Sequence, residues 1–206
     1  MRDKIRTERQ KQIEKAAFDL LEEYGYEGIS MLKIAKRAKA SNETLYRWYG
    51  DKKGLFQSLV QNNAKEISRL LFSDVDSSRP LYEMLDVLGP TLLTLLTGPR
   101  AIALNRAAAG DPTGDLGRAL AKSGRDTIMP LIEKVFERAD ITNDTPIGEP
   151  TNFADIYVRL LVGDLQIRRA TGAIPQLSKS AILQRAKEAS SLILRFMEDA
   201  EDTNFN

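Results

Sequence analysis

The chain has 206 residues, enough for one large or two small domains with a buried core. Its 42% hydrophobic and 29% charged residues are typical of a globular protein and not of a disordered one. It contains neither cysteine nor histidine, which excludes disulfides, zinc–cysteine sites and Ser-His-Asp or Cys-His catalysis. We therefore expect no metal, no cofactor and no enzyme activity.

The net charge of +1 is unevenly distributed along the sequence. Residues 1–53 hold 13 Lys and Arg against 9 Asp and Glu, a net charge of +4, whereas residues 54–206 hold 17 against 20, a net charge of −3. A basic N-terminal part suits a protein that contacts phosphates at one end. Because the first residues are charged and no apolar signal segment follows, the sequence predicts a cytoplasmic protein.

The first expected helix has apolar residues at spacings of three and four, the pattern of an amphipathic helix. Thr7 and Gln10 form a capping box near its start, and Gly25 stands where it should end. Basic residues before it, Arg2, Lys4 and Arg6, are either an arm towards the minor groove or an idle tail. The apolar stripe consists of Ile13, Ala16, Ala17, Leu20, Leu21 and Tyr24.

Two short helices follow, separated by about three residues, which is the helix-turn-helix pattern. Ser30 opens the first, with Ile34, Ala35 and Ala38 facing inward, and Ser41 is the N-cap candidate of the second, Asn42 to Tyr49. The second helix of such a pair lies in the major groove of DNA. It is too short to be stable alone in water, so Leu45 and Tyr49 are expected to pack on the preceding helices.

A longer fourth helix starts at Asp51, and five more helices are expected after it, over 80–97, 100–109, 114–139, 151–171 and 179–200. The breaks are polar or rich in glycine and proline and fall at 74–80, 98–99, 110–112, 141–150 and 172–178. The apolar stretch 81–97 is too short and too interrupted to span a bilayer, which needs about 20 apolar residues, so no membrane partner is expected. No stretch alternates like a strand. The sequence predicts an all-α fold of about nine helices.

The N-terminal part resembles the TetR family of transcriptional regulators. The resemblance depends on the joint spacing of Tyr24-Gly25-Tyr26, Ile34-Ala35-x-x-Ala38, Ser41-x-x-Thr44-Leu45-Tyr46-x-Trp48-Tyr49, Asp51-Lys52 and Leu55. It implies a three-helix DNA-binding domain, residues 6–66, joined by the fourth helix to a larger helical domain for ligand binding and dimerisation, residues 67–206.

Three residues depart from the family pattern. Lys39 stands where the family commonly has a glycine in the turn, and Ala40 where a larger apolar residue is usual. A lysine with positive φ costs roughly 1 kcal/mol. Trp48 stands where histidine or tyrosine is more common, and its indole N–H can donate to a phosphate but cannot accept a hydrogen bond.

The resemblance implies that Thr44, Tyr46 and Trp48 contact backbone phosphates. It implies the same for Lys52, whose ammonium beside the free amides of a helix N-terminus would form a phosphate clamp. Three of these residues have a plainer interpretation: Tyr46 and Trp48 as packing aromatics, and Lys52 as an ordinary surface lysine.

Base edges are expected to be read by polar residues of the same helix. Asparagine suits adenine, arginine suits guanine and glutamate accepts from cytosine, so Asn42, Arg47 and Glu43 are the candidates. Glu43 could equally stabilise the helix N-terminus. Ser41 completes the expected DNA-binding set.

The C-terminal helices near 151–171 and 179–200 are expected to form a homodimer. The first has an overfull apolar face and the second carries small residues that allow close approach. A two-fold dimer matches a palindromic operator with half-sites roughly 34–36 Å apart. The apolar residues are Phe153, Ile156, Tyr157, Leu160, Leu161 and Leu165 in the first, and Ile182, Ala186, Ala189, Ile193 and Met197 in the second.

An effector pocket is expected in the C-terminal domain by analogy with the family. Asp164 interrupts an apolar stripe, and a buried carboxylate needs a partner, such as Arg168, Arg169 or a cationic ligand. Plain core is the simpler interpretation of the apolar candidates. The candidates are Leu88, Leu92, Asn105, Tyr157 and Asp164.

The expected function is that of a sequence-specific regulator, a repressor released from its operator by a small-molecule ligand that shifts the dimer population. One alternative is a non-specific or architectural DNA-binding protein without an effector, which would show steep salt dependence and little sequence preference. Two further alternatives are an enzyme that uses carboxylates and a helical adaptor with a vestigial helix-turn-helix.

Overall fold

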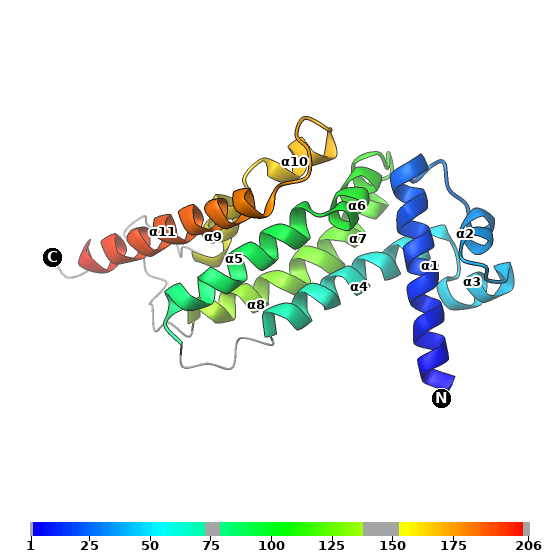
Figure 1. Ribbon diagram of the computed structural model, residues 1–206, viewed down its shortest axis with the longest axis horizontal. Coiled ribbons are helices and arrows are strands. Elements are labelled where there is room, and N and C mark those ends of the chain that lie inside the picture. Colours follow the sequence, from blue (N-terminus) through cyan, green and yellow to red (C-terminus); the bar gives the residue numbers. More distant parts are fainter. Residues whose placement is uncertain (1, 73–78, 138–152, 204–206) are drawn as a thin grey trace. The chain divides into compact units, whose positions relative to one another are not determined.

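The computed structural model describes residues 2–72, 79–137 and 153–203 (Figure 1). Within these ranges the regular secondary structure is entirely helical, which confirms the all-α prediction. The expected breaks at 74–78 and 141–150 lie outside the described residues. The helices are α1 (Arg2–Tyr24), α2 (Met31–Arg37), α3 (Asn42–Tyr49), α4 (Lys52–Phe72), α5 (Leu81–Thr97), α6 (Pro99–Ala109), α7 (Asp115–Leu120), a π-helical turn (Ala121–Arg125), α8 (Asp126–Glu137), α9 (Phe153–Val162), α10 (Leu165–Ala170) and α11 (Lys179–Thr203).

The protein forms two compact units, Met1–Ala64 with Pro99–Gly124, and Lys65–Gly98 with Arg125–Asn206. This division differs in one respect from the expected domains, because residues 99–124 pack with the N-terminal helices. The physical reason is a shared core, in which Leu104 of α6 and Leu116 of α7 are buried with the apolar residues of α1 and α4. The first unit is therefore larger than the expected three-helix DNA-binding domain.

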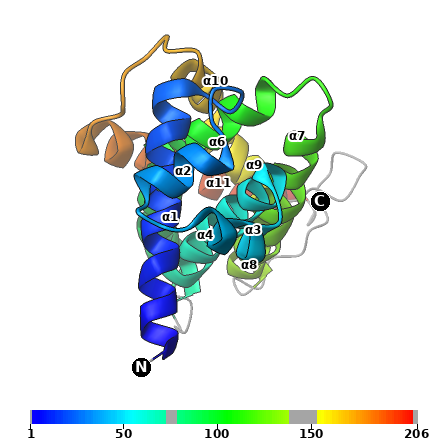
Figure 2. The same ribbon diagram turned by 90° about the vertical axis from the view of Figure 1, so that its right-hand side faces the viewer.

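In the first unit, α2 contacts both α1 and α3 (Figure 2). The apolar stripe of α1 from Ile13 to Leu21 is buried as expected, and Leu45 of α3 is completely buried. Tyr24 was expected in this core but is 57% exposed, since it ends α1 and its ring lies under the ammonium of Lys33.

The start of α1 also corrects the sequence interpretation. The helix begins at Arg2, so Thr7 and Gln10 lie within it and are not a capping box. Arg2, Lys4 and Arg6 lie within this helix, and their role as an arm towards the minor groove stays a prediction.

In the second unit, α11 packs along α5 and α9 (Figure 1). Ala186, Ala189, Ile193 and Met197 are buried there, whereas the sequence interpretation assigned them to the dimer surface. The close approach that small residues allow occurs inside the unit: a Cβ added to Gly89 of α5 would lie 3.0 Å from the Cβ of Ala186. The inner face of α11 is thus used within one protomer.

The expected helix over 151–171 is divided into α9 and α10. Gly163 has a φ of 49° and Asp164 follows with φ −91° and ψ 3°, which ends the helical run. Asp164 is therefore not buried: its side chain is 68% exposed, and its carboxylate lies 3.9 Å from the guanidinium of Arg168 one turn later. Among the described residues, no single helix is long and apolar enough to cross a membrane; the bent α5–α6 pair meets that criterion only when combined.

Candidate nucleic-acid interface

Helix α3 is fixed at both ends and on one face. Ser41 caps its N-terminus, where the hydroxyl oxygen accepts a hydrogen bond from the amide of Thr44 at 3.1 Å and lies 2.7 Å from the Thr44 hydroxyl. Leu45 anchors the helix in the core, and Gly50, with a φ of 77°, ends it. A helix of eight residues is stable here because capping and burial replace the turns that it lacks.

The polar residues of α3 are accessible. Asn42, Glu43 and Arg47 are exposed, and the side chain of Tyr46 is 50% exposed. Trp48 is half-buried, and the guanidinium of Arg6 lies 5.7 Å from the centre of its ring. Four of the expected DNA-binding residues, Ser41, Thr44, Arg47 and Trp48, line one groove, whereas Asn42, Glu43 and Tyr46 are exposed but do not line it.

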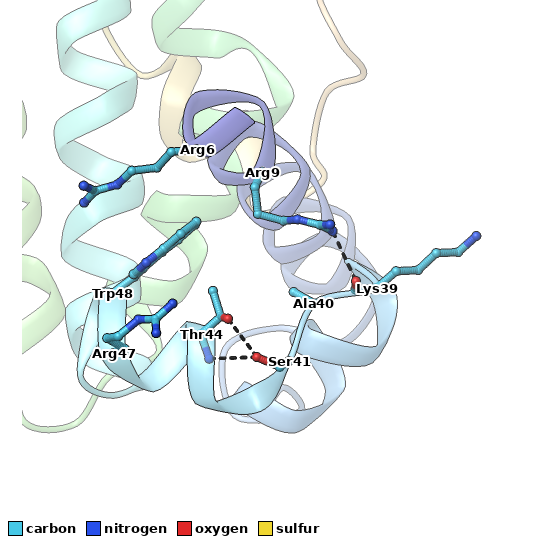
Figure 3. A pocket seen from close by; sticks show the side chains of 8 residues that line it. All are labelled: Arg6, Arg9, Lys39, Ala40, Ser41, Thr44, Arg47 and Trp48. Carbon is cyan, nitrogen blue, oxygen red and sulfur yellow. Dashed lines mark hydrogen bonds between the residues drawn. The ribbon is translucent and has the colours of Figure 1, made fainter. Parts of the chain in front are cut away.

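The turn before α3 has the left-handed conformation expected at the position where the family commonly has glycine. Lys39 has a φ of 51°, a region that costs a residue with a side chain about 1–2 kcal/mol. The Lys39 side chain extends away from Trp48 and Arg47, while its carbonyl oxygen faces Arg9 of α1 (Figure 3). The Nη1 atom of Arg9 donates to that oxygen at 3.1 Å and to the carbonyl oxygen of Ala38 at 3.5 Å.

Between the start of α1 and α3 lies a groove of about 700 Å³ (Figure 3). Four of the eight side chains that line it are cationic and none is acidic. Hydroxyl donors and an aromatic ring complete its wall, so the groove offers both charge and hydrogen bonds to an anion. Its lining residues are Arg6, Arg9, Lys39, Ala40, Ser41, Thr44, Arg47 and Trp48.

Lys52 starts α4, as expected for a phosphate clamp, but its ammonium already has a partner. It donates to the carbonyl oxygen of Tyr26 at 3.1 Å and lies 4.1 Å from the centre of the Tyr26 ring. An ammonium has three donors, so this contact orients Lys52 and leaves further donors for a phosphate. Asp51 caps α4 by accepting from the amide of Gly54 at 2.7 Å, and Lys53 pairs with Asp115 of α7.

Sequence interpretation missed two residues of this surface, Arg6 as a neighbour of Trp48 and Arg9 altogether. Their spacing of three puts both side chains on one face of α1, and that signal was available. What it could not show is that this face meets the turn at Lys39, since the contact joins residues about 30 positions apart.

The expected effector residues are not all brought together. Leu88, Leu92 and Tyr157 are buried in the core of the second unit. Asn105 belongs to the first unit, where its amide nitrogen donates to the carbonyl oxygen of Ala101 one turn earlier in α6. Asp164 is exposed at the α9–α10 break.

Comparisons with known proteins identify similar transcriptional regulators. Residues 13–59 match the family described as bacterial regulatory proteins, tetR family. The sequence is 38% identical over 162 residues to the Uncharacterized HTH-type transcriptional regulator YdeS of Bacillus subtilis (strain 168), covering 74% of this chain and 78% of that protein.

Solved structures with the same fold extend the likeness to nearly the whole chain. A TetR transcriptional regulator from Agrobacterium tumefaciens superposes with a TM-score of 0.69 at 26% identity, over 91% of this chain and 93% of that chain. The transcriptional regulator FadR from Bacillus subtilis, solved in complex with stearoyl-CoA, superposes with a TM-score of 0.65 at 16% identity, over 88% and 96% of the two chains.

Proposed function

The chain belongs to the tetR family of bacterial regulatory proteins and is a DNA-binding transcriptional regulator, not an enzyme; from this we propose that it binds a palindromic operator as a homodimer and represses transcription until a small-molecule ligand releases it. The observation that carries the DNA-binding mode is the cationic groove beside α3, whose lining includes four basic side chains and no acidic one. Because it would act on operator DNA, we propose that the protein acts in the cytoplasm.

The proposed DNA contacts divide into backbone and base contacts. Ser41, Thr44 and Tyr46 present hydroxyl groups, Trp48 presents its indole N–H and Lys52 its ammonium, all of which suit phosphate oxygens. These groups would hold α3 against the DNA backbone, and such contacts do not read the base sequence.

The base contacts come from the exposed polar face of α3. We assign the reading of base edges to Asn42, Glu43 and Arg47, which are exposed and are not used by the core. Arg47 also lines the groove, so its guanidinium can reach a phosphate or a guanine edge.

Homodimer formation is proposed through α9, α10 and α11. Because the inner face of α11 is used within the protomer, the dimer surface has to be its outer face. Leu183 and Leu192 of α11 and Ile167 of α10 are large apolar residues with 48%, 53% and 59% of their surface exposed. Exposed large apolar side chains on these helices support a subunit interface there.

Ligand release is proposed to act through the second unit. FadR from Bacillus subtilis has been solved with stearoyl-CoA bound, and its fold covers most of this chain. We propose that Leu88, Leu92 and Tyr157 of α5 and α9 line the equivalent pocket here. A ligand that prefers one dimer arrangement would shift the population away from the one that fits adjacent grooves, and operator DNA would weaken that ligand by the same factor.

The DNA part is tested by selecting bound sequences from random duplexes with the full-length protein at a stated salt concentration. We expect an enriched palindrome with half-sites one helical turn apart. Binding without enrichment would identify a non-specific or architectural protein. Arg47→Ala should relax specificity at one base position, whereas Lys52→Ala should weaken all sequences alike and reduce the salt slope by about one.

The ligand part is tested on the selected duplex, with stearoyl-CoA as the first compound. An effector raises the melting midpoint of the free protein by mass action and releases the duplex. A compound that raises the melting midpoint without changing DNA affinity binds the protein but is not its effector. Release of the duplex by a compound whose own affinity is not weakened by DNA would contradict the population shift.

A further inference from the structure

Arg9 joins two segments that are far apart in the sequence. It is half-buried on α1, and its Nη1 donates to the carbonyl oxygens of Lys39 and Ala38, at 3.1 and 3.5 Å, across 30 and 29 residues. Both carbonyls lie at the end of α2, where helix geometry leaves carbonyl oxygens without an amide partner. The guanidinium, supplied by another helix, therefore caps the C-terminus of α2.

The turn that Arg9 holds is a strained one. Lys39 is the one residue other than glycine with a positive φ among the residues that the structure describes. The backbone there is also held by the amide of Ala40, which donates to the carbonyl of Ala35 at 2.9 Å. Ser41, the N-cap of α3, is only two residues beyond Lys39, so the direction of this turn decides where α3 begins.

The geometry points to Arg9 as a positioning residue that sets α3 relative to α1 by holding the Lys39 turn in its left-handed conformation. This inference rests on the proposed DNA binding, and it differs from a phosphate contact in what it predicts. A residue that only contacts phosphate acts in the complex alone. A residue that holds the turn acts in the free protein as well, and its effect depends on the strain at Lys39.

The free protein is tested by hydrogen exchange of the full-length protein, with no DNA present. Arg9→Gln is compared with Lys11→Gln, which removes the same charge from an exposed position of α1. We expect Arg9→Gln to accelerate exchange of the Lys39 and Ala40 amides at least about tenfold, because their turn opens more often, and Lys11→Gln to leave it unchanged. Equal exchange in the two variants would overturn the inference.

The dependence on strain is tested by a double-mutant cycle at Lys39. Lys39→Gly and Lys39→Ala both remove the lysine charge, but only glycine relieves the strain. In the alanine background Arg9→Gln should weaken binding of the selected duplex by about tenfold, and in the glycine background by about twofold or less. Equal factors in both backgrounds, together with a salt slope reduced by about one, would show that Arg9 is a phosphate contact and not a positioning residue.

The two arms separate failure of this inference from failure of the proposed function. If the wild-type protein selects no DNA sequence, the proposed operator binding fails, while the exchange experiment still decides whether Arg9 holds the turn. If exchange responds to Arg9→Gln but affinity for the selected duplex does not, positioning for DNA binding is refuted.

Discussion

Two tyrosine hydroxyl groups, each enclosed by its unit, differ in whether they have a partner. The hydroxyl of Tyr157 lies 3.5 Å from that of Ser190 in the second unit. The hydroxyl of Tyr49 in the first unit is buried and has no hydrogen-bond partner among the described residues. Burial is the main reason why both have a pKa raised to about 12, since it disfavours the charged phenolate.

Tyr157 should make the second unit sensitive to alkaline pH. Its pKa is raised in the folded state from an ordinary value of 10.0 to about 12, so it stabilises the fold fully below pH 10, and this contribution is lost as the pH rises towards 12. Tyr157→Phe should therefore change stability by a constant amount below pH 10. Above pH 10, the free energy of unfolding of the variant should rise relative to that of wild type, by up to about 3 kcal/mol. Denaturant unfolding as a function of pH measures this, and a pH-independent difference would contradict it.

Tyr49→Phe should stabilise the protein. Removing a buried hydroxyl without a partner avoids a desolvation cost of about 1 kcal/mol, which raises the melting midpoint by roughly 2–4 °C. Tyr46→Phe is the matched control, because this neighbouring hydroxyl is on an exposed side chain and its loss should leave the midpoint unchanged. The DNA effects should be the reverse: weaker binding for Tyr46→Phe and little change for Tyr49→Phe. A lower midpoint for Tyr49→Phe would mean that its hydroxyl has a partner in solution.

At the scale of the elements, the break between α9 and α10 depends on one glycine. Gly163 has a φ of 49°, and a Cβ there would also lie 3.2 Å from the guanidinium of Arg185. Gly163→Ala should cost about 1–2 kcal/mol and lower the melting midpoint by roughly 2–8 °C.

Gly117 provides the opposite case on another helix. It lies within α7, and an added Cβ would meet no atom within 4 Å. Gly117→Ala should raise the midpoint by roughly 1–4 °C, because alanine loses less backbone entropy on folding. Circular dichroism of both variants checks the pair, and equal shifts would show that the left-handed conformation at Gly163 is not what matters.

The same break shows how far sequence pattern predicts this fold. Helices α1, α2 and α3 follow from local signals, namely the apolar stripe of α1 and the capping serines at Ser30 and Ser41, and the structure confirms them except for the start of α1. The stripe over 151–171 continues across Gly163, and an isolated glycine is tolerated within helices, so the pattern predicted one helix. The left-handed backbone conformation of Gly163 ends the helix, and the spacing of apolar residues carries no information about that conformation.

In the candidate site, too, some features follow from local sequence pattern and others do not. Exposure of Glu43 and Arg47, each two residues from Leu45, follows from the position of Leu45 on the opposite face of a short helix, which is a local pattern. The contact of Arg9 with Lys39 and the packing of α6 with α1 join distant segments, and a single sequence does not specify such pairs. Asp164 was expected to be buried because the helix was expected to continue.

At the scale of the whole molecule, a palindromic operator requires two copies of the protein, so dimer formation and DNA binding should fail together. The outer face of α11 presents Leu192 with 53% of its surface exposed, and a glutamate there would bring an unpaired charge into the proposed interface. Leu192→Glu should weaken the dimer by about 2–4 kcal/mol, a factor of roughly 30–1,000 in its dissociation constant.

Val87→Glu is the matched control, because Val87 is an apolar residue of α5 that is 40% exposed and lies outside the proposed interface. Sedimentation should show wild type and Val87→Glu at twice the 23.0 kDa of one protomer, and Leu192→Glu at the mass of one protomer. Leu192→Glu should also lose most of its affinity for a full palindrome but little of its weak affinity for one half-site, since its groove beside α3 is untouched. A Leu192→Glu variant that remains dimeric would place the interface on another face of the second unit, and loss of half-site binding would indicate damage to the fold instead.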